Sequence, residues 1–442
     1  MRIRTLVSLS LLAAGAAAPA ATASAQTPPP ARSFSIVGAT IHPVSGPDIA
    51  GGTVVVRDGK IASVSPGAAP AAGTPVVDGK GLHVYPSLFP PMTVLGLEEI
   101  DAVRATRDKE ELGGINPASR ADVAINYDSE LLPVARSGGI LVAGVTPIGG
   151  IISGTAVATE LDGWTREDAT LKAPAAITVF WPDLRVNRSP DASRSVKKQE
   201  KTRDEALERL KKAFRDARAY GKARSAERTA GVPKHDFDPR LEALLPALDG
   251  TIPVVVNAKR LAQIRDAVKW AAEEKLRLVI WGGADAWRMA DELAKAGVPV
   301  ILESPLELPV RDDDPYDIQF ADAGILDKAG VRVAFNDGGS DSSNVRNYPQ
   351  LAALAVAYGY PREKALASLT LEPARILGVD GRIGSLEPGK DATLVLTDGD
   401  ILDLRSRVVA AYLEGRALDL TDKQKRLYER YRNRPTPAAP SR

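Results

Sequence analysis

Residues 84–97, with the sequence VYPSLFPPMTVLGL, form an apolar run that is entered through Pro86. The run follows a strand-like segment at 75–80, and Gly79 and Gly81 punctuate the chain just before it. A continuous apolar run bounded by such residues is typical of a buried strand. We therefore expect residues 84–97 to open the main domain of the protein.

From residue 253 onward, apolar strand-like segments alternate with helical ones. The strand-like segments cover 253–256, 277–281, 298–302 and 331–335, and the helical ones cover 261–274, 285–296 and 321–329. Strands separated by helices of this kind indicate βαβ units and a parallel sheet. In a domain of this size they predict a (β/α)8 barrel.

Short β-segments precede the barrel. Residues 34–64 read as strands, and Asp58-Gly59 stands between two arms of alternating apolar residues. An Asp-Gly pair in this position is a strong signal for a β-hairpin. We therefore expect a small β-rich unit before the main domain.

Several of these segments resemble the amidohydrolase superfamily, and they do so in chain order. Besides 84–97, which resembles the first barrel strand, the segments are 51–64 (GGTVVVRDGKIASV), 138–147 (GGILVAGVTP), 367–378 (ASLTLEPARILG) and 384–396 (GSLEPGKDATLVL). The resemblance covers residues 34–419 and points to the imidazolonepropionase-like branch. It implies an α/β fold, a (β/α)8 TIM-like barrel with a small β-sandwich module built from both N- and C-terminal segments.

The resemblance also implies a division of the chain into domains. The expected parts are a signal peptide at 1–25, a Pro-rich linker at 26–33, a composite β-module from 34–85 and 383–419, the barrel at 86–382, and a C-terminal helix and tail at 420–442.

In this family, histidines at the ends of barrel strands and one aspartate hold one or two divalent metals. The corresponding positions here are Met92 and Val94 on the first strand, Asn257 on the fifth and Gly282 on the sixth, and only the aspartate of the eighth strand, Asp337, has a counterpart. A thioether, an isopropyl group and a neutral amide cannot replace imidazoles around zinc or a similar ion. We therefore predict no metal and no cofactor, although the family uses zinc or another divalent metal.

Asp337 is the candidate catalytic residue, because the equivalent carboxylate in active relatives accepts a proton from the attacking water. The competing interpretation is structural, since Asp337 with Gly338 and Gly339 has the composition of an ordinary turn. The sequence does not identify a counterpart of the fourth-strand ligand.

Charge and composition exclude several classes of partner. The chain of 442 residues has 57 Lys and Arg against 56 Asp and Glu, so no nucleic-acid partner is expected. It has no cysteine, which rules out disulfides and thiolate zinc sites, and only three histidines, His42, His83 and His235. The charged segment 197–228 carries one narrow apolar stripe and is expected to be a surface helix without an assigned role.

Residues 1–25 have the pattern of a secretory signal peptide. Arg2 and Arg4 precede an apolar stretch at 6–18, and Ala23-Ser24-Ala25 forms a small-residue cleavage site. The apolar stretch is shorter than the roughly 20 residues of a membrane span. We expect an exported, periplasmic protein with no membrane span after signal cleavage.

These observations favour an exported amidohydrolase-like protein with a degenerate metal site, acting as a metal-free binding or partner protein. Its partner would be a small-molecule ligand or a metal-bearing paralogue. The alternative is a hydrolase of non-peptide C–N bonds, in cyclic amide or imidazolone-like substrates. That alternative uses an atypical site around Asp337, assisted by Asn257, Glu303 or His235.

Overall fold

The computed structural model describes residues 32–67, 69–227, 233–234 and 236–434. The predicted signal peptide at 1–25, most of the predicted linker at 26–33, and His235 lie outside the described residues, as does the end of the C-terminal tail.

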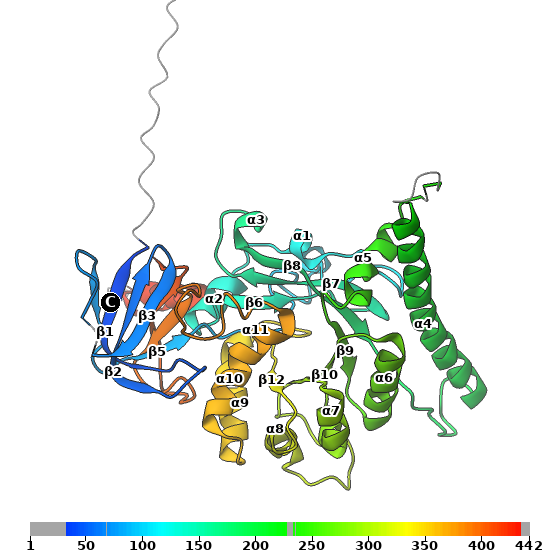
Figure 1. Cartoon of the computed structure of the whole chain (residues 1–442). Coiled ribbons are helices and arrows are strands. Elements are labelled where there is room, and N and C mark those ends of the chain that lie inside the picture. Colours follow the sequence, from blue (N-terminus) through cyan, green and yellow to red (C-terminus); the bar gives the residue numbers. More distant parts are fainter. Residues whose placement is uncertain (1–31, 68, 228–232, 235, 435–442) are drawn as a thin grey trace, which may run out of the picture. The chain divides into compact units, whose positions relative to one another are not determined.

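One sheet gathers strands from both ends of the described chain, in the order β15-β14-β13-β5-β1-β2-β3, with β4 paired to β1. In Figure 1 the blue strands of the N-terminal segment lie beside the orange strands of the C-terminal one. The strands are β1 (Phe34–Ile41), β2 (Ile49–Arg57), β3 (Lys60–Pro66), β4 (Val76–Asp78), β5 (His83–Pro86), β13 (Leu394–Thr397), β14 (Val408–Leu413) and β15 (Arg416–Ala417). We call this sheet the composite module.

The composite module forms one continuous sheet around a core of its own. Strand β1 pairs with β2 along its whole length, and on its other edge it pairs with β4 through its first half and with β5 at its end. The sheet also folds back on itself, because the Ile61 amide donates to the Lys390 carbonyl at 2.9 Å and the Gly389 amide donates to Ile61 at 2.8 Å. The β-rich module expected from the sequence, built from N- and C-terminal segments, is therefore present, and its strands are hydrogen-bonded into one continuous sheet.

A second sheet forms most of a barrel, in the order β12-β11-β10-β9-β8-β7-β6. Its strands are β6 (Val142–Val145), β7 (Ile152–Glu160), β8 (Thr170–Phe180), β9 (Val254–Ala258), β10 (Leu278–Gly282), β11 (Val300–Leu302) and β12 (Val333–Phe335). The opening stretch closes the barrel between β6 and β12. It forms bridges Leu88–Ile140 and Thr93–Val145 on one side, and on the other the Val94 amide donates to Gly338 at 2.9 Å.

The barrel-like α/β domain is thus confirmed, but its first half departs from the regular (β/α)8 pattern. Strand β7 runs antiparallel to both β6 and β8, whereas β8 through β12 are parallel. The reason is the connection at residues 146–151, which is too short for the dozen or more residues that a parallel crossover needs. The opening stretch is also divided, since residues 84–86 belong to β5 of the composite module.

Helices cover the outside of the parallel half of the barrel, where Figure 1 shows α6, α7 and α8 beside β9 to β12. The helices are η1 (Arg104–Thr106), α1 (Ala121–Ala124), α2 (Leu131–Ser137), α3 (Arg166–Ala169), α4 (Val196–Ala226), α5 (Pro239–Leu248), α6 (Leu261–Glu274), η2 (Ala286–Met289), α7 (Ala290–Ala296), α8 (Ile318–Lys328), η3 (Val345–Asn347), α9 (Tyr348–Ala357), α10 (Arg362–Leu369), α11 (Leu371–Leu377) and α12 (Lys423–Arg432).

Two of these helices illustrate how sequence pattern sets burial. Helix α6 buries Ile264, Ala267, Trp270 and Ala271, which recur at helical spacing and face the barrel. The long helix α4 buries only four residues, Leu210, Phe214, Ala217 and Tyr220, and its charged remainder is solvated as expected. No helix in the part of the chain that the structure describes is both long and apolar enough to cross a membrane.

Candidate functional site

A cavity of about 280 Å³ lies where four parallel strands of the barrel end. Asn257 and Trp281 lie at the ends of β9 and β10, and Glu303 and Asp337 follow β11 and β12. The carboxyl ends of parallel barrel strands are where barrel proteins place their ligands. This cavity is therefore the candidate site.

The first-strand positions expected in the site are sealed away from it. The side chains of Met92 and Val94 are both fully buried, and neither lines the cavity. Met92 packs inside the barrel in one apolar cluster with Trp281, Val255 and Ile301, whereas Val94 belongs to a different cluster. The first strand therefore contributes apolar packing to the barrel and no ligand atom to the cavity.

Asn336 fixes the first strand to β12 from inside the barrel. Its side-chain oxygen accepts from the Met92 amide at 2.8 Å, and its side-chain nitrogen donates to the Met92 carbonyl at 2.9 Å. Asn336 is 1% exposed, so both bonds are shielded from water. A buried amide that is satisfied at both ends holds its partner strand in one position.

Trp281 fills the centre of the barrel mouth. It is 1% exposed and packs edge-to-face on Phe180, with ring centroids 5.6 Å apart. A Cβ atom on Gly339 would lie 2.6 Å from Cζ2 of the indole, so this position of the β12 loop requires glycine. Among the described residues, the indole nitrogen of Trp281 has no hydrogen-bond partner.

Gly282, the sixth-strand position, adopts a left-handed conformation with φ of 96°. It carries no side chain and does not line the main cavity. It borders a smaller adjoining cavity with Lys259, Glu303 and Asp322.

The open side of the cavity is charged. The Lys259 ammonium lies 2.9 Å from a carboxylate oxygen of Glu303 and 3.7 Å from one of Glu307. Burial lowers the pKa of Lys259, but the two carboxylates outweigh that effect and the net pKa is raised. Lys259 therefore stays protonated and occupies one edge of the cavity.

Asp337 lines the same cavity and has no cation beside it in the described part of the chain. One of its oxygens accepts from the Gly338 amide at 2.8 Å. Burial raises the pKa of Asp337, the Gly338 amide lowers it, and the nearby charges of Asp341 and Glu303 raise it further. A half-buried carboxylate of raised pKa accepts a proton more readily than an ordinary aspartate.

The residues present do not fit the divalent metal that the resemblance implies. Of the five expected ligand positions, the two on the first strand are apolar and sealed, the sixth-strand one has no side chain, the fifth-strand one is a neutral amide, and only Asp337 is a carboxylate. In the described residues, no three His, Cys, Asp or Glu side chains gather as metal ligands. Borderline metals require several imidazole, thiolate or carboxylate donors converging on one point.

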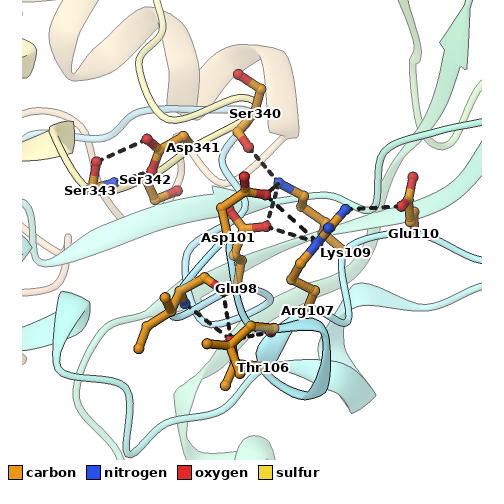
Figure 2. A network of polar contacts seen from close by, with 12 residues as sticks. Glu98, Asp101, Thr106, Arg107, Lys109, Glu110, Ser340, Asp341, Ser342 and Ser343 are labelled. Carbon is orange, nitrogen blue, oxygen red and sulfur yellow. Dashed lines mark hydrogen bonds and ion pairs between the residues drawn. The ribbon is translucent and has the colours of Figure 1, made fainter.

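A network of buried charges links the loop after the first strand to the loop after β12, as Figure 2 shows. The Lys109 ammonium forms an ion pair with Glu98 and donates to the Ser340 carbonyl at 2.9 Å. Arg107 and Asp101 extend the network at 3.7 Å from each other. Since Ser340 lines the cavity, this network fixes one side of its rim.

Sequence reasoning missed two features of the chain. Lys259 is the first residue after β9. Its position directly after a predicted strand is the signal that would have identified it as a cavity residue. His42 and His83, which seemed unrelated, lie in the composite module with their ring nitrogens 2.9 Å apart, and His42 also contacts Asp48 at 2.8 Å. No pattern along the chain predicts that pair, because it depends on the pairing of β1 with β5.

The fold and the cavity define an α/β-barrel protein with a composite β-module. The amidohydrolase family matches residues 317–423. An amidohydrolase from Thermotoga maritima is similar in structure, with a TM-score of 0.76 and 25% identity over 87% of this chain and 99% of that one. The family match and the structural similarity both support the amidohydrolase superfamily.

Local similarity to curated proteins agrees with this family. Amidohydrolase tasK of Hapsidospora irregularis is 39% identical over 66 residues, covering 15% of this chain and 7% of its own length. A 5-methylthioadenosine/S-adenosylhomocysteine deaminase of Symbiobacterium thermophilum is 35% identical over 83 residues, covering 16% of this chain and 19% of its own length. The matches span less than a fifth of either relative.

Proposed function

We propose that this amidohydrolase-superfamily protein is a metal-free binding protein, which holds a small organic ligand in the cavity at the ends of β9 to β12. The observation that carries the proposal is the double hydrogen bond between Asn336 and Met92. It fixes an apolar side chain inside the barrel on the strand from which two metal-binding histidines would otherwise project. What remains open to a ligand is a polar cavity without a metal-binding donor set.

The metal content of the purified protein tests this proposal. The protein is incubated with excess zinc, manganese and calcium, desalted, and analysed by elemental mass spectrometry. We expect a stoichiometry well below one metal per chain. One or two tightly held metals per chain would show that the protein does have a metal site, and the proposal of a metal-free binding protein would be rejected.

A second candidate function is hydrolysis of non-peptide C–N bonds, in cyclic amides or imidazolone-like rings. The raised pKa of Asp337 favours it, because a carboxylate of that kind can take a proton from water, and the Asn257 amide lines the same cavity. The test is turnover of such substrates by the wild-type protein and by Asp337→Ala. Turnover that is lost in this variant supports hydrolysis, and its absence in the wild type rejects it.

Partnership with a metal-bearing paralogue extends the binding proposal. In that arrangement the paralogue supplies catalysis and this chain supplies stability or regulation. Co-expression followed by size-exclusion chromatography would show a joint peak, and separate elution at micromolar concentrations would reject the partnership.

Export to the periplasm is part of the same proposal and rests on the pattern of residues 1–25. N-terminal sequencing of the protein from fractionated cells tests it. A mature chain beginning at Gln26 in the periplasmic fraction is expected, and an uncleaved chain confined to the cytoplasmic fraction would contradict it.

A further inference from the structure

We infer that helix α12 (Lys423–Arg432) docks the protein on an anionic lipid surface, along which the helix lies without crossing the membrane. The proposed ligand binding gives this helix no role, and the inference does not depend on it. It is carried by an exposed apolar stripe on α12, by an ion pair that turns the stripe away from the rest of the protein, and by cations along both edges of the stripe.

The apolar side chains of α12 form one exposed stripe. Leu427, Tyr428 and Tyr431 are 39%, 62% and 60% exposed, and no residue of the helix is buried. At 3.6 residues per turn these three positions span an arc of about 100°. A helix that packs on its own protein buries such a stripe, as α6 does. The stripe of α12 is therefore not covered by any described part of the chain.

An ion pair fixes which side of α12 faces the protein. Arg426 lies on the other side of the helix from the stripe and pairs at 2.9 Å with Glu130, which directly precedes α2. Asp422, which is 4% exposed, caps the helix by accepting from the Lys425 amide at 2.8 Å. The helix is thus attached to the protein through the side opposite its apolar residues, and the stripe faces outward.

The edges of the stripe are basic. Helix α12 has five Lys or Arg residues against one Glu. At helical spacing, Lys423 and Arg430 border one edge of the stripe, and Lys425 and Arg432 border the other. Lys425, Arg426 and Arg432 each reach a carboxylate, whereas Lys423 and Arg430 form no ion pair with any described residue. An apolar stripe between two rows of cations is the arrangement that lies on anionic lipid surfaces.

The basic surface continues beyond Lys425. This residue borders a hollow of about 280 Å³ together with Arg346 and Arg407, two exposed side chains that form no ion pair with any described residue. The one carboxylate in its lining, Asp403, is already paired with Arg405 at 2.6 Å. The hollow therefore offers space and positive charge to a phosphate headgroup beside the docked helix.

Helix α4 shows why a lipid surface is favoured over an acidic polymer. It has eleven Lys or Arg residues against five Asp or Glu, but it exposes no large apolar side chain. Basic charge alone would serve a nucleic acid or an acidic protein segment equally well on either helix. A lipid surface also offers an apolar layer below its headgroups, and tyrosine, with an apolar ring and a polar tip, suits that boundary. Only α12 has both features.

The experiment mixes the purified protein with vesicles and measures how much protein floats with them in a density gradient. One set of vesicles contains phosphatidylglycerol and phosphatidylcholine in equal parts, and the other contains phosphatidylcholine alone. The protein begins at Gln26, because the apolar stretch at 6–18 would bind vesicles by itself. We expect flotation with the anionic vesicles only, and less of it as the salt concentration rises.

Two double variants test the two parts of the surface. Lys423→Gln with Arg430→Gln removes the two unpaired cations and should weaken binding to the anionic vesicles about 10- to 30-fold. Tyr428→Ser with Tyr431→Ser leaves the charge unchanged, reduces the stripe to its leucine and should weaken binding about 10-fold or more. None of these side chains is buried, so the midpoint of thermal unfolding should stay unchanged in both variants.

The matched control carries the same change of charge on another basic helix. Lys197→Gln with Lys222→Gln on α4 removes two exposed cations that form no ion pair with a described residue, and it should leave flotation unchanged. A loss equal to that of the charge variant on α12 would mean that the vesicles respond to the net charge of the protein, and would overturn the inference.

Other results would overturn it as well. No flotation with the anionic vesicles, or equal flotation with both kinds, rejects an anionic lipid surface as the partner. Unchanged binding in the tyrosine variant shows that the stripe does not enter the lipid. Binding to polyglutamate as tight as to the anionic vesicles assigns the surface to an acidic protein. A dimer in size-exclusion chromatography that the tyrosine variant abolishes assigns the stripe to a second copy of the chain.

Discussion

The two halves of the barrel mouth differ in their side chains: one half is packed apolar core, and the other lines a polar cavity. In the closed half, which comprises residues 88–95 with β6, β7 and β8, apolar side chains such as Met92 and Val94 are fully buried. In the open half, formed by β9 to β12, Lys259, Glu303 and Asp337 line a cavity. Both halves lack imidazole ligands, but they lack them differently: the closed half has packed apolar core at those positions, whereas the open half has polar groups around a cavity, in the place where barrel proteins bind ligands.

The Lys109 network joins the closed half to the open half. Among the substitutions considered, removal of Lys109 should lower the free energy of unfolding the most. Lys109→Ala leaves the buried Glu98 carboxylate with only the more distant Arg107, at 3.7 Å, and breaks the bond to Ser340. We expect the free energy of unfolding to fall by as much as about 3–5 kcal/mol, the cost of leaving a buried charge without a close partner. Urea denaturation measures it.

The double variant Glu98→Gln with Lys109→Met is the control, since it removes both charges together. It should recover most of the loss. A loss below about 1 kcal/mol in the single variant would mean that water solvates Glu98, and that the two halves are not joined by this pair.

Truncating one side chain in each half compares how much packing in that half contributes to the free energy of unfolding. Met92→Ala creates a cavity in the interior of the closed half and should lower the free energy of unfolding by about 3 kcal/mol. Ser304→Ala in the open half removes a side chain that lines the cavity and accepts one exposed bond from the Leu306 amide at 3.3 Å, and it should change the free energy of unfolding by less than about 0.5 kcal/mol. Thermal and urea unfolding of both variants checks this, and equal losses would contradict the distinction between core and site.

A pH dependence of stability is expected from Glu160, the last residue of β7 in the closed half. Burial, aided by Glu414 and opposed by Arg382, raises the pKa of Glu160 from 4.5 to about 8, and Asp391 and Arg416 also face it. The native state therefore holds a proton that the unfolded chain has released between those values. Stability is greatest below pH 4.5 and falls as pH rises toward 8, by at most about 1.4 kcal/mol per pH unit.

Glu160→Gln should flatten that part of the pH profile and stabilise the protein above pH 7. The comparison is made against the wild type at each pH, because His42, whose pKa is lowered by burial, contributes a slope of the opposite sign below pH 6.5. Identical slopes in wild type and variant would show that Glu160 is ionised in the native state.

The same contrast explains what the sequence could predict. The open half could be predicted from the local sequence pattern, because each strand after residue 253 is followed by a helix. The ends of these strands place Asn257 and Asp337 at one edge. The antiparallel β7 was not accessible, because β6, β7 and the second half of β8 are almost entirely buried and show no alternation that would reveal direction. The feature that determines the direction of β7 is the short connection at 146–151. A short connection indicates an antiparallel pair only once it is known which strands it joins.

Side-chain placement in the cavity was beyond sequence reasoning for a different reason. The inward position of Trp281 depends on the absence of a Cβ at Gly339, more than 50 residues away in the chain. The sharing of Lys259 between Glu303 and Glu307 depends on how β9 and β11 are staggered around the barrel. Barrel stagger is set by the whole sheet, and no segment of it carries that information alone.

The composite module has a consequence for the order in which the protein can fold. Strand β13 lies between β5 and β14, so β5 has an unpaired edge until the last 50 or so residues have been made. An open edge with apolar neighbours invites pairing with other chains, and contacts between distant parts of a chain form slowly. The chain therefore depends on its final segment to protect its first one, and premature termination near residue 390 should yield an aggregating product in place of a smaller folded protein.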